Sequence, residues 1–205
     1  MKDEEKALRA THAQTAVLRS LTDEMQRSDG DVDASLRDQA VEESARLVAA
    51  ARDLSKARSE SGRPLSPDTD GDEERRARIL VVEDDDQSRS AIATGLGPLY
   101  DVVCATNGVE GLKAASSRDF DAVVTDLWMP EMDGISMVAQ IRGMQPLAAI
   151  PVVLLTAETS PEPIVQGFAA GATAYVPKPV DLDLLHRELQ WVLTASADAR
   201  MRPVH

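Results

Sequence analysis

The sequence has one cysteine, no long apolar run and few aromatic residues, and each shortage excludes a class of protein. Cys104 cannot form a disulfide within the chain, which favours a reducing compartment over secretion. It lies in the apolar run VVCA, so we expect a small buried side chain there. No segment approaches the roughly 18 apolar residues of a membrane helix, and the N-terminus MKDEEKALRA lacks the apolar core of a signal peptide. We therefore expect a cytoplasmic protein without a membrane segment.

Basic charge is also in short supply. The chain has 205 residues, with 22 Lys and Arg against 35 Asp and Glu, and its formal net charge of −13 argues against a nucleic-acid or acidic membrane partner. The acidity is uneven, because residues 1–78 hold 14 basic and 18 acidic side chains whereas residues 79–205 hold 8 and 17. With 43% hydrophobic but only 3% aromatic residues, any core must be aliphatic. Acid clusters in the second part could hold a hard cation.

Residues 1–58 have the pattern of a helical hairpin. From Asp3 to about Arg27 there is no Pro or Gly, and small or apolar residues recur every three or four positions: Leu8, Thr11, Thr15, Leu18, Thr22 and Met25. The turn sequence SDGD at 28–31 follows, and a second helical pattern runs from Val32 to about Arg58 with a heptad series at Ala40, Leu47 and Leu54. Two helices joined by a short turn form an αα-hairpin or coiled-coil-like segment.

The apolar stripes of this hairpin are thin and rich in Ala and Thr, so the hairpin needs something to pack against. A second copy of the chain is one candidate, and we then expect Leu47 and Leu54 to pack across a homodimer formed through residues 1–58. The alternative is an arm that docks a partner. Residues 59–77, SESGRPLSPDTDGDEERRA, have the composition of a flexible linker.

From residue 78 onward, short apolar runs alternate with helical patterns. The runs are near-continuous rather than alternating, as in strands that are covered on both faces, and they occupy 79–82, 101–105, 121–125, 150–155 and 174–176. The helical patterns lie near 87–97, 108–117, 134–143, 162–170 and 182–195. This alternation predicts an α/β domain at 78–197, a (βα)5 doubly wound five-stranded parallel sheet of the flavodoxin-like type, with a tail at 198–205.

Polar residues follow four of the five predicted strands. The first strand is followed by Glu83 and Asp84, the third by Asp126, the fourth by Thr156 and the fifth by Lys178. Because the carboxyl ends of parallel strands meet at one edge of a sheet, these side chains should converge.

Such a set has a clear chemical use. Clustered carboxylates with an open side suit Mg²⁺, and a carboxylate beside that ion can act as a nucleophile toward a phosphoryl group. Phosphoryl transfer then requires charge neutralisation and positioning, which an ammonium such as that of Lys178 and a hydroxyl such as that of Thr156 would supply.

Four motifs in order, ILVVEDD, TDLWMPEMDG, LLTAE and AYVPKP, make residues 79–196 resemble the receiver domain of two-component response regulators. The resemblance implies that Asp126 is the phosphoacceptor, that Glu83 and Asp84 are the acidic pair, and that the backbone carbonyl of Trp128 is a further magnesium contact. It gives Lys178 and Thr156 the roles described above. It also implies a sensor histidine kinase or a histidine phosphotransfer protein as phosphodonor, and a cis Lys178–Pro179 peptide.

The same resemblance makes Thr156 and Tyr175 a switch pair that alters the face formed by the predicted elements at about 160–195. That face binds partners or dimerises in the family, and the helix at 162–170 has Ile164, Val165 and Phe168 but no basic residue. Only about nine residues follow the last predicted helix, so we expect no C-terminal DNA-binding output domain. The output would then come from the N-terminal helices or a bound protein.

Several residues have simpler interpretations. Asp85 and Asp86 are better explained as acids at a helix N-terminus than as metal ligands, and Asp133-Gly134 as a helix cap. His12 and His186 are expected at the surface.

Three alternatives to a phosphorylated receiver remain. One is an unphosphorylated scaffold, and a second is an aspartate-nucleophile phosphatase resembling the haloacid dehalogenases, although those have the nucleophile on the first strand. The third is a histidine-kinase-like hairpin phosphorylated on His12, whose neighbours THAQ lack the usual acid. The leading interpretation is a signalling protein whose only catalysis is its own phosphorylation and dephosphorylation.

Overall fold

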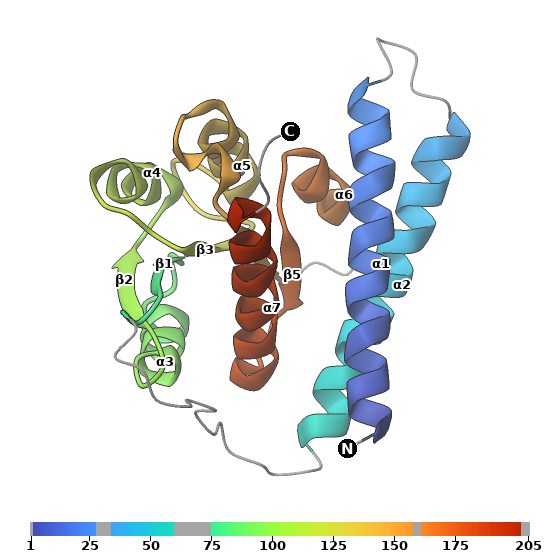
Figure 1. The fold of residues 1–205 in the computed structure, drawn as a ribbon, viewed down its shortest axis with the longest axis horizontal. Coiled ribbons are helices and arrows are strands. Elements are labelled where there is room, and N and C mark those ends of the chain that lie inside the picture. Colours follow the sequence, from blue (N-terminus) through green and yellow to red (C-terminus); the bar gives the residue numbers. More distant parts are fainter. Residues whose placement is uncertain (1, 28–33, 60–74, 158–160, 202–205) are drawn as a thin grey trace.

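The computed structural model describes four segments of the chain, residues 2–27, 34–59, 75–157 and 161–201, with the side chains of residues 2–7, 52–59 and 197–201 excepted. Most of the predicted linker and tail therefore lies outside the described residues. Within them, an α/β domain runs from the first strand to the last helix, and a pair of long helices precedes it in the chain (Figure 1).

The α/β domain contains one five-stranded, all-parallel sheet with the strand order β2-β1-β3-β4-β5. This is the flavodoxin-like arrangement that the alternating pattern predicts. The strands match the predicted apolar runs to within about two residues, and they are β1 (Arg78–Val82), β2 (Asp101–Ala105), β3 (Ala122–Asp126), β4 (Val152–Thr156) and β5 (Ala174–Pro177).

Helices cover both faces of the sheet. A short 3-10 turn η1 (Leu147–Ala149) precedes β4, and the helices of the domain are α3 (Asp86–Leu96), α4 (Gly108–Ser117), α5 (Gly134–Gly143), α6 (Pro161–Ala169) and α7 (Leu182–Met201). The helix α6 ends at Ala169, and Gly171 follows with a φ of +104°, a conformation that favours glycine. The next residue, Ala172, donates from its backbone N–H to Gly167 O at 3.0 Å.

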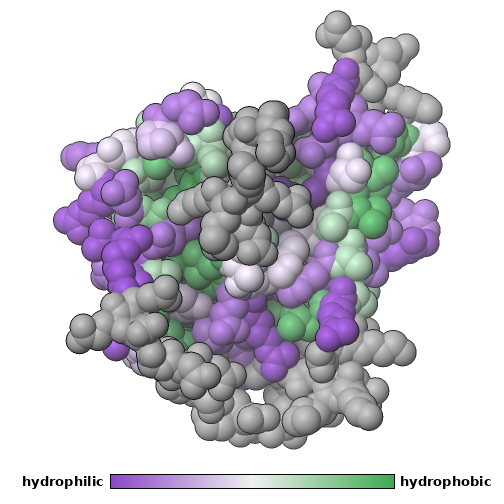
Figure 2. All heavy atoms as spheres, in the orientation of Figure 1, coloured by the Kyte–Doolittle hydropathy of each residue, from purple (hydrophilic) through white to green (hydrophobic). Residues whose placement is uncertain are grey.

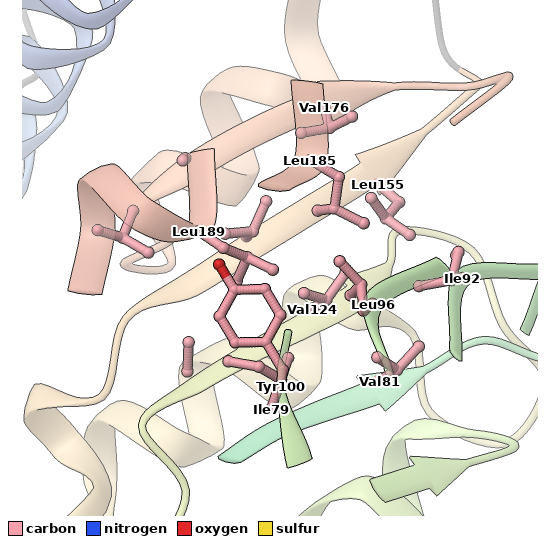
Figure 3. Packing of buried hydrophobic residues seen from close by; sticks show 14 of the residues in the cluster. Ile79, Val81, Ile92, Leu96, Tyr100, Val124, Leu155, Val176, Leu185 and Leu189 are labelled. Atoms are coloured by element: carbon pink, nitrogen blue, oxygen red, sulfur yellow. The ribbon is translucent and has the colours of Figure 1, made fainter. Parts of the chain in front are cut away.

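The two faces of the sheet form two separate cores that are mainly aliphatic. Side chains alternate along each strand, so that Ile79 and Val81 of β1 face α3 and α7, while Leu80 and Val82 face α4 and α5. Figure 3 shows the first core, in which strand residues such as Val124 and Leu155 lie between Leu96 of α3 and the leucines of α7. All five residues of β3 and of β4 are buried, which explains their near-continuous apolar sequences.

The two N-terminal helices, α1 (Lys2–Arg27) and α2 (Ala34–Ser59), pack side by side as predicted. Their common stripe consists of the residues that the spacing identifies, since Leu18, Ala40 and Leu47 are buried. Figure 2 shows apolar residues interrupting the hydrophilic surface along the hairpin side of the molecule. Among the described helices, none is both long enough and apolar enough to cross a bilayer.

The hairpin lies against α6 and β5 of the same chain (Figure 1). A third apolar cluster forms there from both parts, with Leu47 and Val48 of α2 against Phe168 of α6 and Tyr175 of β5. The premise that Leu47 needs a second copy is therefore wrong, because it is only 1% exposed within one chain. The side chain of Leu54 lies outside the described residues, and the dimer itself stays a prediction.

Three other expectations are corrected. Cys104 is exposed rather than buried, because β2 is an edge strand of the sheet. His186 is buried, and its Nδ1 lies 2.8 Å from the Tyr100 hydroxyl. His12 is not a free surface residue either, since its ring stacks on Trp191 of α7. The sequence gives no sign of these last two contacts, because each joins residues that are more than 80 positions apart.

Candidate functional site

The predicted site residues come together at the carboxyl edge of the sheet. Asp126 is the last residue of β3 and Thr156 the last residue of β4, while Glu83 follows β1 and Lys178 follows β5. These strands are neighbours in the order β1-β3-β4-β5, so parallel pairing alone brings the four positions side by side.

Asp126 is at the centre of the group and is only 6% exposed. Its Oδ1 accepts a hydrogen bond from the backbone N–H of Leu127 at 2.7 Å, and its Oδ2 accepts one from Lys178 Nζ at 2.8 Å. The chain then turns closely behind it, because a Cβ atom at Gly134 would lie 2.1 Å from the Asp126 carbonyl oxygen. Glycine is therefore required at position 134, and this explains the Asp-Gly pair that ends the motif.

Lys178 bridges two carboxylates. Its Nζ lies 2.9 Å from Glu83 Oε1 and 2.8 Å from Asp126 Oδ2. Desolvation by burial would lower the pKa of Lys178, but its hydrogen bonds to Asp126 and Glu83 outweigh this and raise the pKa above the ordinary value. The side chain is thus held as an ammonium ion at the site.

Glu83 is fully buried, and burial is the main reason why the pKa of its carboxyl group is raised. The nearby Asp126 adds to this rise, while the hydrogen bond from Lys178 opposes it. Its Oε2 also lies 2.8 Å from Lys178 Nζ, so both oxygens of this buried carboxylate are close to the ammonium.

Glu83, Asp84 and Asp126 form a group of three carboxylates whose ligand oxygens lie within 4.8 Å of one another. Asp84 is exposed and leaves one side of the group open to solvent. Oxygen-only ligands with an open side are the donors that Mg²⁺ prefers, so these residues fit that ion.

Arg89 is a site residue that the sequence interpretation missed. Its Nη1 donates to the carbonyl oxygens of Glu83 at 2.8 Å and Asp84 at 3.3 Å, and its Nη2 contacts the Asp86 carboxylate. The guanidinium thereby fixes the backbone that presents the acidic pair. The only signal available was an arginine three residues after Asp86, which has the spacing of a common helical ion pair.

The neighbouring acids have the structural roles expected of them. Asp85 caps α3 by accepting from Ser88 N at 2.8 Å, and Asp86 lies in the first turn of that helix. Asp133 caps α5 by accepting from Ser136 N at 2.7 Å. The Trp128 side chain is 54% exposed beside the site, and the Lys178–Pro179 peptide is cis as the resemblance implies.

Thr156 and Tyr175 project from the same face of the sheet. Thr156 pairs with Pro177 across β4 and β5, and Leu154 pairs with Tyr175, so the two residues are one pleat apart on adjacent strands. Both are buried, and Tyr175 belongs to the cluster that the hairpin covers. Tyr175 therefore connects this part of the sheet with the hairpin cluster.

Comparison with known proteins agrees with this arrangement. Residues 79–190 match the family described as the response regulator receiver domain. The chain is 41% identical over 117 residues to "Transcriptional regulatory protein ZraR" of Escherichia coli O157:H7, a match that covers 56% of this chain and 26% of that protein. It is 35% identical over 116 residues to "Probable cyclic di-GMP phosphodiesterase" of Vibrio cholerae, covering 55% and 26% of the two chains.

Solved structures show the same domain. The chemotaxis protein CheY4 of Vibrio cholerae superposes with a TM-score of 0.55 and 35% identity, covering 57% of this chain and 98% of that one. This chain matches only about a quarter of the length of these curated relatives. The match covers more than half of this chain and includes every strand of the sheet, so the chain belongs to the response regulator receiver domain family.

Proposed function

We propose that this chain is a response regulator whose receiver domain accepts a phosphoryl group on Asp126 in the presence of Mg²⁺, and that the phosphorylated form signals through protein contacts. The observation that carries the proposal is the Asp126 carboxylate, held between the Lys178 ammonium on one side and the Glu83–Asp84 acidic pair on the other. The family membership supports the same function.

The phosphodonor in this proposal is a phosphohistidine of a sensor histidine kinase or of a histidine phosphotransfer protein. An oxygen of the Asp126 carboxylate attacks the phosphorus atom, and the bond from phosphorus to the donor imidazole nitrogen breaks. The electron pair of that bond leaves with the imidazole, and an acyl phosphate forms on Asp126.

The protein positions the reactants and balances their charge. Lys178 Nζ already lies 2.8 Å from Asp126 and would stabilise a phosphoryl oxygen, and the Thr156 hydroxyl would donate to another. Glu83, Asp84 and Asp126, together with the backbone carbonyl of Trp128, would hold Mg²⁺. When bound, that ion supplies positive charge that offsets the repulsion between the carboxylates and the incoming phosphoryl group.

The change is transmitted by packing. Movement of Thr156 toward the phosphoryl group would open space on the face of the sheet where Tyr175 lies, and the Tyr175 ring would turn inward. The surface that responds is formed by α6, β5 and α7. We further propose a cytoplasmic location and no catalysis of an external substrate, and the phosphodiesterase named among the relatives has most of its length outside the matched region.

Phosphorylation by a small donor tests this function. Acetyl phosphate with Mg²⁺, followed by a phosphate-affinity gel, should shift the wild-type chain and leave Asp126→Asn unshifted. Asp133→Asn is the matched control, because Asn caps a helix as well as Asp does and labelling should persist. Persistent labelling of Asp126→Asn would contradict the assignment, and loss of labelling in His12→Ala alone would favour the hairpin histidine instead. An unlabelled wild-type chain would favour the scaffold interpretation.

A further inference from the structure

The hairpin buries its apolar stripe on the receiver domain. In the third cluster, Leu18 is 0% exposed and Leu47 1%, and the whole buried set is Leu18, Ala40, Leu47, Val48 and Ala51 from the hairpin with Ile164, Val165, Phe168 and Tyr175 from the receiver domain. Without the hairpin, the receiver residues of this set would form an exposed apolar patch next to the edge strand β5.

Polar contacts extend the same interface onto α7. The ring of His12 stacks on Trp191 with a centroid distance of 4.3 Å and an interplanar angle of 10°. His12 Nε2 also lies 3.1 Å from Oε1 of Glu188, whose side chain is 2% exposed. The hairpin therefore supplies the partner of a buried carboxylate, in addition to apolar area. Gln26 adds a hydrogen bond from its Nε2 to the carbonyl oxygen of Ala169 at the end of α6.

Three buried hydroxyl groups of the hairpin have hydrogen bonds that do not depend on the receiver domain. Each donates to a carbonyl oxygen of its own helix: Thr15 to Thr11 at 2.9 Å, Thr22 to Arg19 at 2.9 Å, and Ser44 to Val41 at 2.9 Å. Ser44 Oγ also lies 3.3 Å from the carbonyl oxygen of Pro161 at the start of α6, but its bond to Val41 can remain when the hairpin leaves. Separation therefore leaves none of these three hydroxyl groups without a partner.

The interface between the hairpin and the receiver domain lies close to the proposed phosphorylation site. Tyr175 packs in the hairpin cluster, and it lies one pleat from Thr156 on the adjacent strand. Thr156 in turn is at the end of β4, the strand that pairs with β3 and Asp126. An inward rotation of the Tyr175 ring would remove a side chain against which the hairpin packs. Because protein interiors are closely packed, the hairpin could not keep the same contacts after such a rotation.

From these observations we propose that the hairpin α1–α2 is a releasable occupant of the protein-docking surface formed by α6, β5 and α7. It is seated when Asp126 is unmodified and is loosened when Asp126 carries a phosphoryl group. The proposal rests on the proposed function for the phosphoryl part, while the docking part rests on the cluster alone. An external partner for this surface would have the chemistry of the hairpin, namely a helix with a narrow stripe of Leu, Val and Ala.

Linkage makes the proposal quantitative. If a phosphoryl group at Asp126 favours release, then release must favour binding at Asp126 by the same factor, and such couplings typically amount to about 5–150-fold. A variant that undocks the hairpin should therefore bind beryllium fluoride, a phosphoryl mimic, more tightly in the presence of Mg²⁺. The factor should lie in that range.

Two neighbouring residues of α1 allow a matched test in the full-length chain. Leu18 is fully buried against the receiver domain, whereas Val17 is 48% exposed. Leu18→Asp should raise amide hydrogen exchange in peptides covering 161–177 and should tighten the binding of beryllium fluoride. Val17→Asp should change neither. His12→Ala removes the stack on Trp191 while keeping a good helix former, and it should produce a smaller change in the same direction.

The outcomes separate the two parts of the proposal. Unchanged exchange at 161–177 in Leu18→Asp would overturn the docking. Raised exchange with unchanged affinity would overturn the coupling to Asp126. Wild-type protein with beryllium fluoride should also show raised exchange in α2 and α6, and Asp126→Asn should not. If beryllium fluoride does not bind the wild-type chain at all, the proposed function and the coupling both fail, and the docking is judged by the exchange data alone.

Discussion

The receiver domain and the hairpin are built from similar amino acids but are stabilised in different ways. The sheet of the receiver domain has a fully buried aliphatic core on each face, and every one of its central strand residues is covered. The hairpin contributes five buried apolar residues among its described side chains, two of them Ala, and they are buried against the receiver domain. The receiver domain has a core formed by its own strands and helices, whereas the hairpin buries its apolar residues only together with those of the receiver domain.

The difference follows from geometry. A sheet covered on both faces uses both sides of each strand, so five residues of β4 bury five side chains. A two-helix hairpin can bury only the stripe between its helices, and the remaining positions face outward unless a third element covers them. The α6–β5 surface is that element in this chain.

The largest expected effect is on the core of the receiver domain. Leu155 in β4 is 0% exposed, and Leu155→Ala should lower the free energy of unfolding by about 2–5 kcal/mol because a cavity remains. Chemical denaturation measured by circular dichroism would test this. A loss below about 1 kcal/mol would mean that the sheet core is less tightly packed than the burial implies.

The next effect concerns the metal. Asp84→Asn removes one of three clustered carboxylates, and Mg²⁺ affinity should fall by at least about tenfold, since even indirect contacts to a metal are worth that much. The fluorescence of Trp128, which lies beside the site, would report the titration. Asp101→Asn is the matched control, because this half-exposed carboxylate lies at the start of β2, at the opposite edge of the sheet, and its loss should leave the titration unchanged. Equal losses in the two variants would place the ion elsewhere.

A smaller effect should separate the two regions directly. Leu47→Ala removes a buried side chain that is worth about 1.5–3 kcal/mol, but this energy holds the hairpin to the receiver domain rather than the sheet together. Hydrogen exchange should therefore rise in α2 and α6, while the receiver strands keep their protection. Light scattering would measure the molar mass of the same variant, and a mass lower than that of the wild type would support the predicted homodimer through residues 1–58. Equal loss of protection in all five strands would show that the two regions unfold as one unit.

The smallest effect is a pH dependence inside the receiver domain. Burial lowers the pKa of His186, whose ordinary value is 6.5, so the unfolded chain binds a proton more readily than the folded chain does. The contribution of neutral His186 to stability is therefore fully present above pH 6.5. It should be lost as the pH falls from 6.5 toward the lower pKa of His186 in the folded chain. His186→Gln should flatten this decline in thermal melts taken between pH 7 and pH 5. An unchanged slope would assign the decline to other groups.

The two histidines show how far local sequence can mislead. Both lie in helical segments without a motif that explains them, which favours a surface position, yet His186 bonds to Tyr100 and His12 stacks on Trp191. Each contact joins distant parts of the chain, and no periodicity encodes it. Cys104 is the opposite case, since its apolar neighbours predict burial but the side chain is exposed. An apolar run can also occur in an edge strand such as β2, which other elements cover less completely.

The sequence by itself determined the sheet, the order of its helices and the convergence of Glu83, Asp84, Asp126, Thr156 and Lys178 at one edge. It could do so because strand periodicity is local, and parallel pairing places all strand ends together whatever the loops do. Only the tertiary structure decided that Arg89 holds the backbone of the acidic pair and that the hairpin rests on α6 and β5 of its own chain. A thin apolar stripe indicates that the hairpin must pack against another surface. The composition of the stripe fits a second copy of the chain and a neighbouring domain equally well. The choice depends on which complementary surface lies within reach once the chain has folded.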